Sequence, residues 1–73
     1  VNLSYLEEQA DNLIASGKAS KEGDAIVIDV TELGYDKVLA KGTITKAFKI
    51  SAHQFSAGAI EKIEELGGEA IEL

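Results

Sequence analysis

The sequence contains no cysteine and a single histidine, so neither disulfide bonds nor a cluster of cysteine or histidine metal ligands can stabilise the fold. With 73 residues, the chain is near the lower size limit for a domain that folds on its hydrophobic core alone. It has two Phe, two Tyr and neither Trp nor Met, although 45% of its residues are hydrophobic. We therefore predict a single domain over residues 1–73, with a core of Ile, Leu, Val and Ala.

A helix is predicted near the start of the chain. Its apolar residues recur three and four positions apart, as on one face of a helix: Leu6, Ala10, Leu13 and Ile14. Ser4 and Glu7 have the spacing of a capping box, in which the hydroxyl and the carboxylate bind free amides at the start of a helix. Gly17 is a suitable end, because glycine readily adopts the left-handed conformation. We expect this helix to pack on the core and to leave an acidic face in solvent.

A strand is predicted over Ala25–Val30, which is mostly β-branched. Apolar residues occupy both of its faces, as is typical of a strand that is covered on both sides or central in its sheet. Residues 18–24 are polar and are expected to form a connection that turns at Gly23. With a short strand over Val1–Leu3, residues 1–30 would form a first β-α-β unit.

The following segment is expected to alternate between turns and short extended pieces. Thr31 and Gly34 predict a turn, the first as its cap and the second at positive φ. Residues 35–39 predict a short strand, and residues 41–42 predict a reversal of the chain. Residues 43–51 predict a strand. The pattern does not decide which of its side chains are buried, because several compete for the buried face: Ile44, Ala47, Phe48 and Ile50.

A second helix is predicted over residues 56–66. Ser56 is expected to cap its start, and Gly67-Gly68 to end it. With strands over 46–51 and 69–73, it would form a second β-α-β unit, parallel and right-handed. The predicted fold class is therefore α/β, a small single domain with a mixed sheet and two helices. Its predicted core consists of Leu6, Leu13, Ile14, Ile28, Val30, Val38, Leu39, Ile60, Ile63 and Leu66.

Charge is distributed unevenly along the chain. The formal net charge is −6, yet the segment Lys37–Lys49 holds four of the seven lysines and neither Asp nor Glu. One interpretation is that these lysines flank strands, blunt exposed edges and keep the domain soluble. The other is that they bind an anionic partner, because charge asymmetry bears on partners rather than on fold. Composition alone favours the first interpretation.

No constellation of residues predicts catalysis. Ser56 has no acid partner for a Ser-His pair, and His53 is a lone imidazole, for which a loop role or contact with RNA is favoured over catalysis. Residues 17–20 lack the order of a phosphate loop. No apolar run approaches the length of a membrane span. We therefore expect no enzyme activity, no cofactor, no metal, no membrane contact and no small-molecule substrate.

Three stretches of the second half together resemble one known family. They read Gly34-Tyr-Asp-Lys-Val-Leu39, Ala52-His-Gln-Phe-Ser56 and Ile63-Glu-Glu-Leu-Gly-Gly68. In this order they are similar to the C-terminal globular domain of large-subunit ribosomal protein fifteen, in its archaeal and eukaryotic form. That family is grouped with protein eighteen-e in one superfamily of α/β domains. The resemblance covers residues 1–73 and is sharpest from Leu33 onward.

Two departures from the family pattern bear on RNA binding. The family usually has Gly-x-Gly after Lys-Val-Leu, whereas this chain has Ala40-Lys41-Gly42. The family also carries a long N-terminal extension, rich in Gly, Lys and Arg, that threads into ribosomal RNA and is not among these 73 residues. The resemblance therefore implies the C-terminal part of a longer chain, without its strongest RNA anchor.

The resemblance implies a structural constituent of the large ribosomal subunit, in the cytoplasm, that binds ribosomal RNA, supports subunit assembly and contacts neighbouring ribosomal proteins. The lysines would neutralise phosphates, Gly42 would let RNA approach the backbone, and Tyr35 or His53 would stack or reach a 2′-hydroxyl. The candidate RNA-binding residues are Lys37, Lys41, Gly42, Thr43, Lys46, Lys49, Tyr35 and His53. The acidic helices would lie away from phosphate. The alternative is an acidic protein–protein interaction module that binds no RNA.

Overall fold

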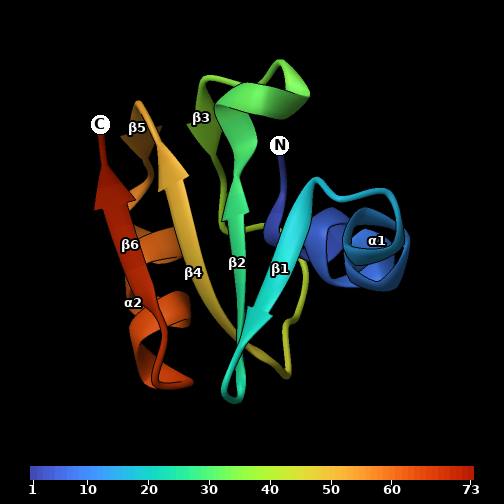
Figure 1. Cartoon of the computed structure of the whole chain (residues 1–73). Coiled ribbons are helices and arrows are strands. Elements are labelled where there is room, and N and C mark those ends of the chain that lie inside the picture. Colours follow the sequence, from blue (N-terminus) through green and yellow to red (C-terminus); the bar gives the residue numbers. More distant parts are fainter.

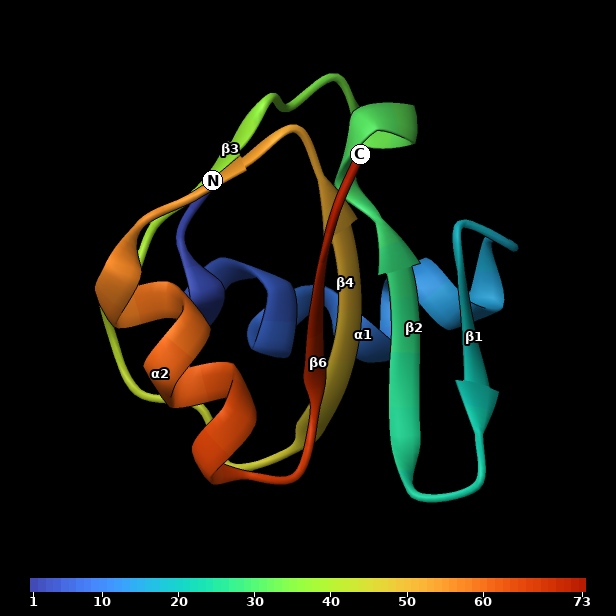
Figure 2. The same ribbon diagram turned by 90° about the vertical axis from the view of Figure 1, so that its left-hand side faces the viewer.

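A computed structural model describes all of residues 1–73 and places two helices on one face of a four-stranded sheet (Figures 1 and 2). The helices are α1 (Leu3–Ala15) and α2 (Ala57–Glu65). In spatial order, the strands of the sheet are β1 (Ala19–Glu22), β2 (Ala25–Asp29), β4 (Ala47–Ala52) and β6 (Glu69–Glu72). A second, two-stranded sheet joins β3 (Lys37–Val38) to β5 (Gln54–Phe55). The predicted α/β class with a mixed sheet is confirmed.

The strands differ in direction between the two halves of the sheet. β2, β4 and β6 are parallel, so the predicted unit of β4, α2 and β6 is confirmed. β1 and β2 form an antiparallel hairpin that turns at Gly23 (φ +60°). The predicted first β-α-β unit is therefore wrong. The chain leaves α1 through Gly17 (φ +80°) and pairs residues 19–22 with the edge of β2. Ala19 is buried in the core, and the polar residues 20–22 are exposed, as is common in an edge strand.

The start of α1 also differs from the prediction. Residues 1–3 contribute only an isolated bridge between Asn2 and Leu39 instead of a strand. The helix begins at Leu3 with Asn2 as its N-cap, and the Asn2 side chain makes no capping hydrogen bond. The capping box of Ser4 and Glu7 is wrong because the Glu7 carboxylate bonds to a distant loop instead.

A short 3-10 helix (Val30–Leu33) replaces the predicted turn after β2. Its cap is Asp29, whose carboxylate accepts hydrogen bonds from the amide (2.9 Å) and the hydroxyl of Thr31. Thr31 is therefore the donor and not the predicted cap. Gly34 ends the element at φ +89°, as predicted.

The core contains 14 buried residues, all hydrophobic, between the sheet and the two helices. Five of the ten predicted members are fully part of it: Leu6, Ile28, Val30, Val38 and Ile63. Leu13 and Ile14 are partly buried against this core, and Ile60 is half-buried. The prediction was wrong for Leu39 and Leu66, which are 40% and 38% exposed. Leu39 lies just after β3, and Leu66 lies just after the end of α2. Both therefore lie outside the elements that bury their side chains against the sheet.

The register of β4 is settled by burial. Phe48, Ile50 and Ala52 are fully buried under the helices, whereas Ala47, Lys49 and Ser51 lie on the opposite face and are half-buried. That opposite face carries neither helix (Figure 2). β2 is central, as predicted, but the helices cover only one of its two faces. Neither helix has the length and hydrophobicity needed to cross a membrane.

Candidate nucleic-acid interface

The lysine-rich segment does not form a single face in space. Lys37 lies on β3, and Lys41 and Lys46 lie in the loop over residues 40–46 that connects β3 to β4 (Figure 1). Lys49 alternates with Phe48 and Ile50 in β4 and so projects from the uncovered face of the sheet. Its Nζ is 3.3 Å from Oε1 of Glu22 on β1. Although the segment Lys37–Lys49 contains neither Asp nor Glu, the fold therefore brings an acidic side chain from another strand next to one of its lysines.

The loop over residues 40–46, called the lysine loop below, brings together four of the predicted RNA-binding residues: Lys41, Gly42, Thr43 and Lys46. All four are exposed. Gly42 adopts φ +88°, and a β-carbon at this position would collide with the side chain of Ser4. The loop therefore passes close over the first turn of α1, which only glycine permits here.

Lys62 on α2 is the main residue of this site that the sequence did not indicate. Its Nζ donates to the carbonyl oxygens of Ala40 (2.8 Å) and Gly42 (2.7 Å). The periodicity of the helix placed Lys62 on the solvent side with its acidic neighbours, but the side chain is half-buried. A single lysine among the acids of α2 is the only signal in the sequence, and it does not specify these carbonyl partners.

Glu7 on α1 binds the other end of the lysine loop. Its Oε1 accepts hydrogen bonds from the amides of Thr45 and Lys46 (3.0 Å for Lys46) and from the Thr45 hydroxyl (3.1 Å). Partial burial alone would raise the pKa of Glu7. The hydrogen bonds from Thr45 and Lys46 and the charge of Lys46 outweigh it, so the pKa lies below its ordinary value of 4.5. Glu7 therefore lies beside Lys46, one of the lysines predicted to bind phosphate.

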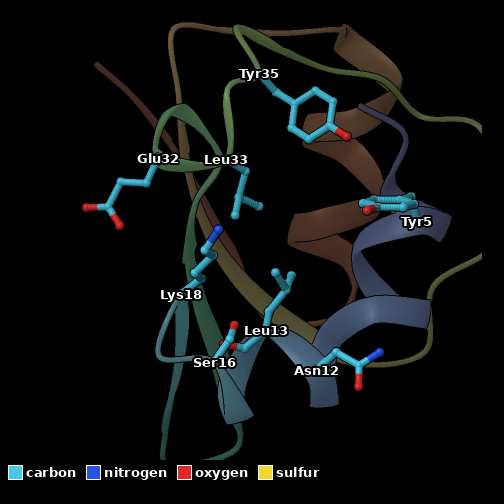
Figure 3. Close-up of a pocket in the computed structure, with 8 residues that line it drawn as sticks. All are labelled: Tyr5, Asn12, Leu13, Ser16, Lys18, Glu32, Leu33 and Tyr35. Carbon is cyan, nitrogen blue, oxygen red and sulfur yellow. The ribbon is translucent and has the colours of Figure 1, made fainter.

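Tyr35 lies in a different place, at a groove of about 430 Å³ between α1 and the 3-10 helix (Figure 3). Its ring meets that of Tyr5 edge to face, with ring centres 6.3 Å apart and planes at 64°. Lys18 and Asn12 also line this groove, and Glu32 points away from the two rings (Figure 3). No residue of the lysine loop lines this groove, and Tyr35 is paired with a second aromatic residue that the sequence did not indicate.

His53 lies beyond the opposite end of β4 from Lys46, in the exposed turn before β5. The intervening strand of six residues spans about 20 Å, at roughly 3.3 Å per residue. Ser56 caps α2 as predicted, because its hydroxyl accepts a hydrogen bond from the Ala59 amide (3.2 Å). No cluster of three or more His, Cys, Asp or Glu side chains is arranged to hold a metal ion.

Comparison with known proteins decides the family. The family model that covers ribosomal proteins 50S-L15 and 50S-L18e and their 60S counterpart matches residues 1–71. The chain belongs to this family. It is 88% identical over 73 residues to large ribosomal subunit protein uL15 of Methanobrevibacter smithii, covering all of this chain and 50% of that protein. It is 49% identical over 70 residues to the uL15 protein of Methanothermobacter thermautotrophicus, covering 96% of this chain and 48% of that protein.

Membership of this ribosomal family confirms the resemblance found in the sequence. The chain spans about half the length of the curated relatives it matches. Ribosomal proteins of this family are not enzymes, in agreement with the prediction for this chain. The absence of a catalytic role for Ser56 and His53 stays a prediction.

The structure also shows what accommodates the side chain of Ala40, one of the two departures noted in the sequence. Ala40 is half-buried and packs against the core. A β-carbon at Gly58 on α2 would lie 3.0 Å from the β-carbon of Ala40, so the missing side chain of Gly58 leaves room for the Ala40 methyl group. The carbonyl of Ala40 points to Lys62, and its methyl group points to α2.

Proposed function

We propose that this chain is a structural constituent of the large ribosomal subunit and binds large-subunit ribosomal RNA chiefly through the lysine loop. The observation that carries the proposal is the exposure of Lys41, Gly42, Thr43 and Lys46 on one ordered loop of a family member whose formal net charge is −6. Phosphate neutralisation by lysine provides most of the sequence-independent affinity for nucleic acid. Thr43 lies between the two lysines and is open to an RNA backbone, whereas the missing side chain of Gly42 makes room for Ser4 of α1.

The other candidate residues have secondary roles in this proposal. Lys49 is paired with Glu22, but both side chains are accessible (35% and 70%), and exposed ion pairs contribute only about 0.2–1 kcal/mol. A phosphate can therefore replace Glu22 as the partner of Lys49. Lys37, Tyr35 and His53 lie outside the lysine loop and would contact other parts of a folded RNA.

The exposed acids of both helices would face solvent or neighbouring ribosomal proteins, because carboxylates repel phosphate. The proposed location is the cytoplasmic ribosome. We also propose that the chain corresponds to the C-terminal half of a longer protein whose basic N-terminal segment supplies most of the RNA affinity. The length of the relatives, about twice that of this chain, supports this part of the proposal.

The test is the salt dependence of binding to a transcript of archaeal large-subunit ribosomal RNA. Each neutralised phosphate contributes about 0.7–0.9 to the slope of log affinity against log salt. Replacing Lys41 and Lys46 by Gln should therefore flatten the slope by about one to two. The control replaces Glu61 and Glu65 by Gln and should leave the slope nearly unchanged.

The alternative function, an acidic protein–protein interaction module, makes the opposite prediction. In that case the slope would not respond to either lysine, and the lysines would serve solubility. Lysine acetylation in assembled subunits provides an independent measurement. The proposal expects Lys41 and Lys46 to be protected relative to Lys21, whereas the alternative expects no such protection.

A further inference from the structure

Two side chains of opposite charge, one from each helix, hold the backbone of the lysine loop. Glu7 of α1 accepts hydrogen bonds from N–H groups at the end of the loop, namely those of Thr45 and Lys46. Lys62 of α2 donates to the carbonyl groups of Ala40 and Gly42 at its start. The carboxylate of Glu7 therefore binds backbone N–H donors of the loop, and the ammonium group of Lys62 binds its backbone carbonyl acceptors.

The backbone of the loop has few hydrogen-bond partners besides these two side chains, although Ile44 anchors the middle of the loop in the core. Residues 40–46 belong to no helix or strand. Among the backbone hydrogen bonds outside regular elements, only one reaches the loop, from the amide of Ser4 to the carbonyl of Lys41 at 3.4 Å. A backbone segment of this kind loses conformational entropy when a partner orders it, and that loss weakens binding. Side chains that fix the segment beforehand remove this cost from the binding step.

We propose that Glu7 and Lys62 are positioning residues for RNA binding, which fix the lysine loop so that Lys41 and Lys46 meet phosphates in a prepared geometry. The inference rests on the proposed function of the loop. Neither residue needs to touch RNA. Glu7 has two opposing effects, since its negative charge near Lys46 repels phosphate while its hydrogen bonds order the backbone that carries Lys46.

Two substitutions of Glu7 separate these effects. Glu7→Gln removes the charge but keeps an oxygen that accepts hydrogen bonds from the same amides, whereas Glu7→Ala removes both. Glu8→Ala is the matched control, because Glu8 is the exposed neighbour on α1. Binding of the 73-residue chain to the ribosomal RNA transcript is measured over a range of salt concentrations. Amide hydrogen exchange of Thr45 and Lys46 is measured in the chain without RNA.

Glu7→Gln should bind at least as tightly as the native chain, with an unchanged salt slope. Glu7→Ala should bind several-fold more weakly than Glu7→Gln, with a slope smaller by about one, the contribution of one phosphate contact. The amides of Thr45 and Lys46 should exchange faster in Glu7→Ala than in Glu7→Gln or Glu8→Ala. The two Glu7 variants carry the same charge, so long-range electrostatics cannot produce the difference.

Substitutions of Lys62 test the positioning role independently, and they remain informative if Glu7→Ala fails to fold. Lys62→Met removes the donors and the charge, and Lys62→Arg keeps both. Lys21→Met, at an exposed position on β1, removes an equal charge away from the loop. Lys62→Met should weaken binding more than Lys21→Met and speed exchange of the Ser4 amide, which donates to the carbonyl of Lys41 in the loop, and Lys62→Arg should restore both.

Equal affinities and slopes for Glu7→Ala and Glu7→Gln, with native RNA binding intact, would overturn the positioning role and leave the proposed function standing. The positioning role would also be overturned if Lys62→Met behaved like Lys21→Met. A native chain that shows no salt-dependent binding to the transcript would instead overturn the proposed function itself.

Discussion

At the scale of single residues, the side chains of Ser56 and Glu7 differ in how far their partners lie along the chain. Ser56 caps the helix that begins at the next residue, so its partner lies three positions away and the role could be predicted. Glu7 binds amides 38 and 39 positions away. Its spacing from Ser4 fits a local motif equally well, and only the tertiary fold decides between the two partners.

The pH dependence of stability provides a test of the Glu7 contacts. The pKa of Glu7 is depressed in the folded chain, so its contribution to stability is complete above the ordinary carboxyl pKa of 4.5. The contribution is lost as the pH falls through the lower pKa of the folded state. Charged acceptors make stronger hydrogen bonds than neutral ones, so the native chain should be more stable than Glu7→Gln at pH 7.

This advantage over Glu7→Gln should shrink at about pH 3, as measured by denaturant unfolding at both pH values. The other carboxylates are common to both proteins and cancel in the comparison. A difference in unfolding free energy that is the same at both pH values would show that the carboxylate is not held by these hydrogen bonds.

At the scale of elements, hydrophobic periodicity predicted both helices and the parallel unit of β4, α2 and β6. It missed β1, because three of the four residues of Ala19-Ser-Lys-Glu22 are polar and the segment has low strand propensity. Edge strands of this kind are specified by their neighbour and by the turns at Gly17 and Gly23 rather than by their own side chains. The sequence likewise could not show that the lysines of one segment lie on different faces, since this depends on the register of β4.

The packing of α2 can be tested at Ile63, which is fully buried. Ile63→Ala should lower the free energy of unfolding by about 2–5 kcal/mol, because it removes buried methyl groups and leaves a cavity. Leu66→Ala is the control one turn later, where the native side chain is 38% exposed, and it should cost clearly less. Urea unfolding of both variants measures the difference. A loss below roughly half a kcal/mol for Ile63→Ala would contradict the observed packing.

At the scale of the whole molecule, four lysines of the segment can neutralise at most four phosphates, while the chain as a whole is acidic. If the chain binds RNA as proposed, the four lysines together are therefore a modest anchor, with a salt slope of at most about 3–4. Tight binding to ribosomal RNA would require further positive charge, and the three remaining lysines are outnumbered by the 13 acidic residues of the chain.

The 73-residue chain should therefore bind the ribosomal RNA transcript more weakly than the complete uL15 protein of Methanobrevibacter smithii, which is about twice as long. The complete protein should also show the steeper dependence on salt, because it should neutralise more phosphates. Filter binding at several salt concentrations compares the two proteins. Equal slopes would show that the remaining half of the relative adds no phosphate contacts.

The central position of β4 has a consequence for biosynthesis. β4 pairs on one side with β2, which precedes it, and on the other side with β6, formed by Glu69–Glu72. During translation the sheet cannot be completed until residues 69–72 have been made. Until then one edge of β4 is unpaired, and such edges promote association between chains. A nascent chain interrupted before Gly68 is therefore the form of this protein most in need of a chaperone.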